Sequence, residues 1–168
     1  MKTATKPARA FARASHDHGH CVEDALERAD ALCAAQGARL TDLRRAVLEL
    51  IWRGHEPTGA YALLAALRGS HPGAAPPTIY RALDFLAAHG LVHRIESLNA
   101  FIGCDHPERP HLSQFLICAR CSIAAEIDDP QVSRALTRSA SEIGFAVTRQ
   151  TVELRGLCPA CRRAAPGP

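Results

Sequence analysis

The 168-residue chain is 47% hydrophobic and 22% charged, values that are ordinary for a globular protein of one large or two small domains. Membrane-spanning runs and a signal-peptide pattern are both missing from the sequence, so we expect a cytoplasmic protein that has no membrane partner. Aromatic residues make up only 5% and the net charge is only +3. This composition disfavours an aromatic platform for single-stranded bases and requires any DNA-binding surface to come from locally clustered basic residues.

Residues 1–22 predict a disordered tail that is basic and contains histidines. Residues 1–15 carry basic but no acidic residues, which is typical of a disordered tail and, less often, of a transit peptide. A tract with metal-binding side chains follows, formed by His16, His18, His20 and Cys21. It could load or buffer metal, although an adventitious surface tract is the more frequent meaning of such a pattern.

Residues 23–104 predict a winged helix-turn-helix domain. Apolar periodicity indicates helices over about residues 22–37, 42–54, 59–68 and 76–90, with Thr41 as the N-cap of the second. Cys33 lies on the apolar stripe of the first helix and is expected to be an inert buried thiol. Two alternating runs, Leu91–Ile95 and Ala100–Gly103, surround a polar turn and predict a β-hairpin that forms the wing.

The fourth predicted helix has one apolar face, formed by Ile79, Ala82, Leu83 and Leu86. Tyr80 and Arg81 lie on the opposite face, near the front of the helix, where a winged helix reaches base edges in the major groove. We therefore expect double-stranded DNA as the partner, with contacts from Tyr61, Thr78, Tyr80 and Arg81. The alternative is an ordinary helix pair with a solvated face.

Residues 105–113 predict a proline-bounded linker, and residues 114–168 a small α/β dimerisation and metal-binding domain. We expect strands over 114–118, 124–127 and 145–154, and a helix over 130–143. The helix places four apolar residues inward: Val132, Leu136, Ala140 and Ile143. A domain this small needs additional stabilisation, which a bound metal and a homodimer partner would supply. The fold class is α+β.

Two Cys-x-x-Cys pairs, which we call knuckles, bracket this second domain: Cys118 with Cys121, and Cys158 with Cys161. This spacing lets both sulfurs of a knuckle bind one ion, so two knuckles make a four-thiolate structural zinc site. The alternatives are two disulfides or two unrelated redox motifs. A bridge within Cys-x-x-Cys is strained and the sequence has no secretory pattern, which favours zinc.

The sequence resembles the ferric uptake regulator family, and specifically its zinc uptake regulator branch, from about Ala25 to Cys161. The resemblance rests on four motifs, residues 39–44, 76–86, 90–97 and 156–161. It implies a regulatory metal site, whose ligands spacing alone does not select, at His93, Cys104, His111 and Glu126. The sequence departs from iron-sensing relatives in having one histidine in residues 111–118, and Ser122 stands where relatives have a glycine.

The resemblance implies a zinc-responsive transcriptional repressor that controls zinc uptake genes and binds operator DNA as a metal-loaded homodimer. Each chain would hold two zinc ions, one structural and one regulatory. The alternative within the family is an iron- or peroxide-responsive regulator. A zinc-dependent hydrolase would need an open coordination position, which four protein ligands do not leave. We therefore expect no enzymatic activity and no small-molecule substrate. A purely structural zinc-ribbon module would leave Tyr80, Arg81 and the wing unexplained.

Overall fold

The computed structural model describes residue 11 and residues 18–54, 56–109 and 111–164. Two compact units meet at residues 110–111, within the predicted linker 105–113. We call residues 18–109 the N-terminal unit, and residues 111–164 together with Phe11 the C-terminal unit. The predicted tail lies outside the described residues, apart from Phe11 and residues 18–22.

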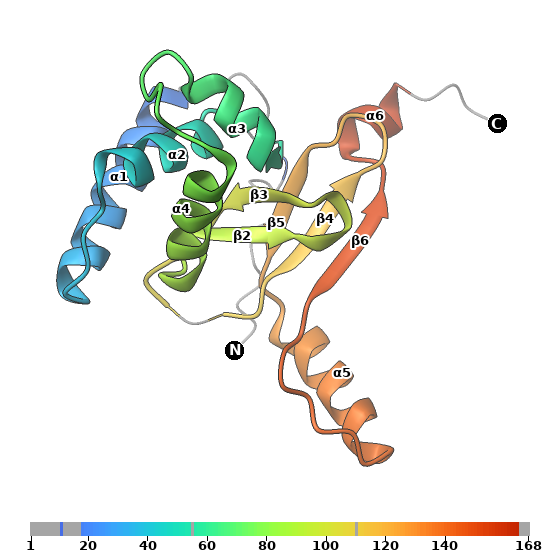
Figure 1. The fold of residues 1–168 in the computed structure, drawn as a ribbon. Coiled ribbons are helices and arrows are strands. Elements are labelled where there is room, and N and C mark those ends of the chain that lie inside the picture. Colours follow the sequence, from blue (N-terminus) through green and yellow to red (C-terminus); the bar gives the residue numbers. More distant parts are fainter. Residues whose placement is uncertain (1–10, 12–17, 55, 110, 165–168) are drawn as a thin grey trace. The chain divides into compact units, whose positions relative to one another are not determined.

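The N-terminal unit consists of helices beside a small antiparallel sheet with strand order β1-β3-β2 (Figure 1). Its elements are α1 (His18–Ala35), α2 (Asp42–Trp52), β1 (Thr58–Gly59), α3 (Ala60–Leu67), α4 (Pro76–Ala88), β2 (Val92–Ile95), η1 (Glu96–Leu98) and β3 (Ala100–Gly103). The predicted helices and hairpin are confirmed. The sequence prediction missed β1, because two residues are too few to show alternation. Helix α1 also begins at His18, so residues 18–22 belong to this helix rather than to a tail.

The core of the N-terminal unit is built from the predicted apolar helix faces. Ile79, Ala82, Leu83 and Leu86 of α4 are all buried. They pack in one cluster with apolar residues of α1, α2, α3 and the wing. Cys33 belongs to this cluster, and burial raises the pKa of its thiol, as expected for an inert core cysteine. Thr41 occupies the N-cap position of α2 with extended backbone, but within the described chain its side chain makes no capping hydrogen bond.

The C-terminal unit contains a three-stranded sheet with strand order β5-β4-β6. Its elements are β4 (Gln114–Cys118), β5 (Ala124–Ile127), α5 (Pro130–Glu142), β6 (Val152–Gly156) and α6 (Pro159–Arg163). Strand β4 pairs antiparallel with β5 and parallel with β6. The parallel pairing brings the end of β4, where the first knuckle begins, beside the end of β6, where the second knuckle begins.

Two predictions for the C-terminal unit need correction. The long strand over 145–154 is wrong in its first part, because β6 begins only at Val152. The apolar face of α5 is not inward, because Ser133 is the only buried residue among those described in the helix, and Leu136 and Ile143 are 47% and 82% exposed. Figure 1 shows the reason, since α5 extends away from the β5-β4-β6 sheet. The periodicity identified an apolar face but not what covers it.

Candidate metal centre and nucleic-acid interface

The four knuckle cysteines lie together in the C-terminal unit. Their sulfur atoms are within 4.8 Å of one another, and Cys121 Sγ lies 3.8 Å from Cys158 Sγ. Sulfurs placed tetrahedrally about 2.3 Å from one zinc ion lie about 3.8 Å apart, whereas a disulfide needs about 2 Å. The four knuckle cysteines all lie in the described part of the chain, and their thiols form no disulfide there. The cluster is therefore the structural zinc site, and the disulfide alternative is wrong.

The groups around these sulfurs favour the thiolate form of Cys118 and disfavour the thiolate form of Cys161. Backbone N–H groups, first of Cys158 and then of Cys121, lower the pKa of the Cys118 thiol to about 6. Burial, followed by hydrogen bonding with the Cys121 and Cys158 thiols, raises the pKa of the Cys161 thiol to about 12. Four thiolates this close repel one another, and a divalent cation removes the repulsion while it deprotonates its ligands. The donor set thus fits zinc.

Two hydrogen bonds to backbone carbonyls connect the first knuckle with the chain around the second. The Ala119 N–H donates to the Gly156 carbonyl at 2.7 Å, and the Arg120 guanidinium donates to the Cys161 carbonyl at 3.3 Å. Ser122, which follows the first knuckle, has a φ of +59°, in the left-handed region that favours glycine. The turn therefore keeps a glycine-like conformation with serine in place.

Two predicted regulatory ligands, His111 and Glu126, lie side by side in the C-terminal unit. His111 Nε2 lies 2.6 Å from Glu126 Oε1, and the Ser113 hydroxyl donates to the same oxygen at 2.6 Å. The side chains of His111 and Glu126 are each only 6% exposed. A buried imidazole beside a buried carboxylate supplies two donor types that zinc accepts.

The other two predicted ligands, His93 and Cys104, belong to the wing. His93 of β2 lies opposite Ile102 of β3. The Cys104 N–H donates to the Leu91 carbonyl at 3.0 Å, so Cys104 lies opposite Leu91 and extends the β2–β3 pairing by one residue pair. Cross-strand partners share a face of a sheet, as do alternate residues of one strand. His93 and Cys104 therefore lie on the same face of the hairpin. Each unit supplies one pair of zinc-binding side chains.

The predicted DNA contacts lie on α3 and α4. Tyr61, near the start of α3, is 71% exposed, and Tyr80 of α4 is 37% exposed. Arg81 is exposed and Thr78 is half-buried, both in the first two turns of α4. The Arg44 guanidinium from α2 lies 3.5 Å from the centroid of the Phe85 ring on α4. Helix α4 is thus packed on one side and presents its first turns on the other, as a recognition helix does.

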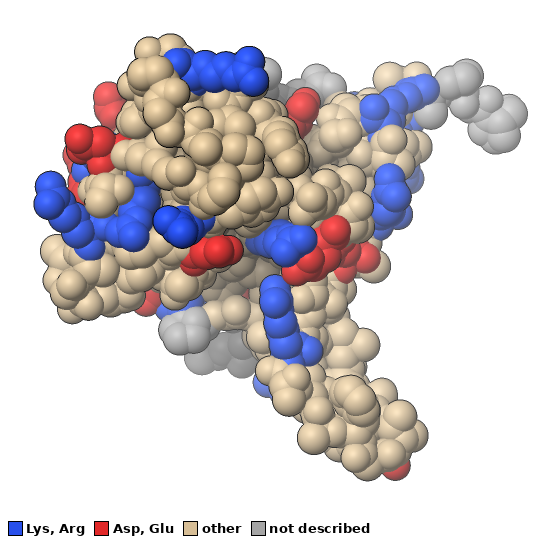
Figure 2. Space-filling model, viewed as in Figure 1, with Lys and Arg blue, Asp and Glu red and all other residues tan. Residues whose placement is uncertain are grey.

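Figure 2 shows how charge is distributed over the visible face of the N-terminal unit. Basic side chains lie at several places around this face, with acidic side chains between them, rather than in a single basic patch.

A winged helix-turn-helix unit followed by a small α/β unit with a four-cysteine zinc site defines a DNA-binding regulator rather than an enzyme. The sequence pattern that describes the Ferric uptake regulator family matches residues 35–155. The chain belongs to this family. Among the described residues, none of the helices is both long and apolar enough to cross a membrane.

Zinc uptake regulators are similar to this chain over 82–98% of their own length. The zinc uptake regulation protein of Escherichia coli K12 is 39% identical over 141 residues, covering 83% of this chain and 82% of the relative. That of Mycobacterium tuberculosis H37Rv is 28% identical over 132 residues, covering 77% and 98%. A solved zinc uptake regulator complexed with zinc and DNA superposes with a TM-score of 0.81 at 38% identity, covering 85% of this chain and 96% of that one. The holo form of the regulator XcZur has a TM-score of 0.75 at 44% identity, covering 82% and 96%.

Proposed function

We propose that this protein is a zinc-responsive transcriptional repressor that binds operator DNA as a metal-loaded homodimer and controls zinc uptake genes. The observation that carries the proposal is the buried thiol of Cys104 on the same face of the wing as His93. A thiolate among imidazole and carboxylate ligands favours zinc over iron or manganese. The solved relative that holds both zinc and DNA supports the same function.

The regulatory step follows from the division of the ligands between the units. One zinc ion bound by His93 and Cys104 of the N-terminal unit and by His111 and Glu126 of the C-terminal unit would restrict the orientation of the DNA-reading unit. Zinc can favour this orientation only to the extent that it binds the closed arrangement more tightly than the open one. Zinc binding and operator binding are then coupled, each strengthening the other.

The homodimer is supported by apolar surface on the C-terminal unit. Exposed large apolar side chains gather on α5 and on the segment that leads through β6: Leu136, Ile143, Phe145, Val147, Leu154 and Leu157. Strand β6 is also an edge strand of its sheet. A second copy of this chain would cover the apolar face of α5 and pair with this edge.

Cysteines that serve as zinc ligands stay reduced, which fits a location in the reducing cytoplasm.

The competing function is an iron- or peroxide-responsive regulator of the same family. Residues 111–118 argue against it, because His111 is the only histidine in this segment. The family resemblance implies that the same segment is histidine-rich in iron-sensing relatives. Operator binding measured with zinc, iron(II) and manganese(II) in parallel, each at buffered free concentration, tests the proposal. We expect zinc to act at the lowest free concentration. Operator binding restored only by iron would overturn the proposal.

A further inference from the structure

We propose that Arg28 of α1 is a positioning residue for the regulatory thiolate, because it fixes the backbone that carries Cys104. The inference rests on the proposed regulatory site and adds a residue outside the sets that we assign to zinc and DNA. The residues that hold this backbone all belong to the N-terminal unit. We call Arg28, Trp52 and Leu91 together the Cys104 seat.

Each of three consecutive backbone positions is held by one member of the seat. The indole of Trp52 lies over Gly103, so closely that a Cβ there would be 2.3 Å from Trp52 Cε2. The next residue, Cys104, donates its N–H to the Leu91 carbonyl at 3.0 Å.

The third position is held by Arg28, whose Nη1 donates to the Asp105 carbonyl at 3.1 Å across 77 residues of sequence. The Cys104 backbone is therefore fixed from both sides, by α2 before it and by α1 after it.

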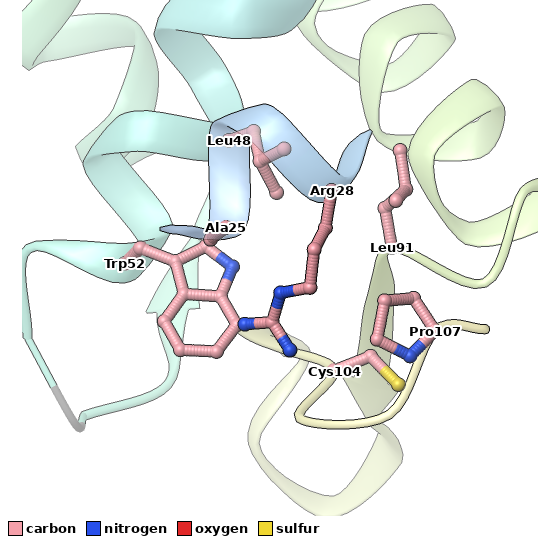
Figure 3. A pocket seen from close by; sticks show the side chains of 7 residues that line it. All are labelled: Ala25, Arg28, Leu48, Trp52, Leu91, Cys104 and Pro107. Atoms are coloured by element: carbon pink, nitrogen blue, oxygen red, sulfur yellow. The ribbon is translucent and has the colours of Figure 1, made fainter. Parts of the chain in front are cut away.

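Arg28 also joins the other parts of the seat. Figure 3 shows its side chain running down from α1 between the indole of Trp52 and the pair formed by Cys104 and Pro107. The Arg28 Cζ atom lies 6.0 Å from the centroid of the Trp52 ring, at the outer range of a cation–π contact. One guanidinium thus donates to the backbone after Cys104 and lies over the ring of the residue that packs on Gly103.

A ligand held before the metal arrives loses less conformational entropy when the metal binds. Residues that orient metal ligands typically contribute 10–100-fold to metal affinity. The seat also ties Cys104 to α1 and α2, which pack with α4 in one core cluster. If metal binding displaces Cys104, the packed helices α1, α2 and α4 would therefore move with it.

The test compares Arg28→Ala and Arg28→Gln with wild type, keeping zinc in the structural site. Arg53→Ala is the matched control, since Arg53 is exposed and pairs with Glu49 one turn away. Cobalt(II) titrated into the regulatory site is followed by thiolate-to-cobalt charge-transfer absorption. Alkylation of Cys104 before cobalt is added is followed by peptide mass spectrometry. We expect both Arg28 variants to bind cobalt about tenfold more weakly or worse, with the same absorption band at saturation and faster alkylation of Cys104.

The role of Arg28 would be overturned if Arg28→Gln bound cobalt and reacted with the alkylating agent as wild type does. Thermal unfolding shows which variants are folded at the assay temperature. If Arg28→Ala is unfolded there, Arg28→Gln decides alone. Cys104→Ser separates this outcome from failure of the regulatory site itself. If Cys104→Ser loses the absorption band and the Arg28 variants bind like wild type, only the seat is wrong. If Cys104→Ser keeps the band, the regulatory site is wrong and the seat has no zinc ligand to position.

Discussion

Replacing Gly103 with alanine is expected to destabilise the N-terminal unit, because the added methyl group has no space. A Cβ at this position would lie 2.3 Å from Trp52 Cε2, 2.5 Å from Nε1 and 2.7 Å from Cζ2. Carbon atoms pack best at about 3.5–4.0 Å, so the indole would have to move by about 1 Å. Trp52 packs against the core cluster and cannot move freely. Overpacking of this kind costs about 1–3 kcal/mol.

For a domain of this size, each kcal/mol lowers Tm by about 4–8 °C. Circular dichroism of the zinc-loaded protein would measure the midpoint for the N-terminal unit. Gly69→Ala is the control in the same unit, since none of the described atoms lies within 4 Å of a Cβ placed there. Combining Gly103→Ala with Trp52→Ala should remove the clash, so the two changes should cost less together than the sum of their separate costs. An unchanged midpoint for Gly103→Ala alone would refute this packing.

Three further substitutions test the zinc site, the DNA interface and the first knuckle. Cys158→Ser should lose the structural zinc, and several kcal/mol of folding energy with it, giving monomer or aggregate in sedimentation; a stable zinc-loaded dimer would contradict this. Arg81→Ala should weaken operator binding by about 1–3 kcal/mol per half-site and relax one operator position, whereas an equal loss on random DNA would make Arg81 a phosphate contact. Ser122→Gly should raise stability by up to about 1 kcal/mol, because the left-handed backbone strains serine; a lower midpoint in thermal unfolding would exclude that strain.

Much of the fold could be predicted because the helices of the N-terminal unit bury their apolar faces within the same chain. The apolar stripe of α4 was predicted residue by residue for this reason. The face of α5 was placed inward from an equally clear pattern, but none of its four apolar residues is buried, and Leu136 and Ile143 are exposed. Periodicity shows that a face is apolar, but it does not show whether the same chain or a second copy covers it. Residues 145–151 show the same limit of sequence patterns. Their apolar and polar residues alternate as in a strand, but this segment is not a strand in the single chain.

The candidate sites were predictable to different degrees. The structural zinc site could be predicted from spacing, because Cys-x-x-Cys fixes two sulfurs locally. None of the four regulatory ligands could be chosen from spacing, and the family resemblance supplied them. The pairing of Ile95 with Ala100 in the structure explains why His93 and Cys104 share one face of the hairpin. His111 and Glu126 could not be chosen from the sequence pattern alone, because their contact depends on the β4–β5 register. The Arg28 contact spans 77 residues and leaves no local signal at all.

The most direct test of the central claim is operator binding titrated against buffered free zinc in wild type and Cys104→Ser, with zinc counted per chain. A serine hydroxyl stays protonated near neutral pH and replaces a metal-bound thiolate poorly. The wild type should hold two zinc ions per chain and bind operator more tightly as zinc rises. Cys104→Ser should keep one zinc and remain a dimer, since the knuckle cysteines are intact, but lose the zinc-dependent rise. A normal zinc response in this variant would contradict zinc regulation through Cys104.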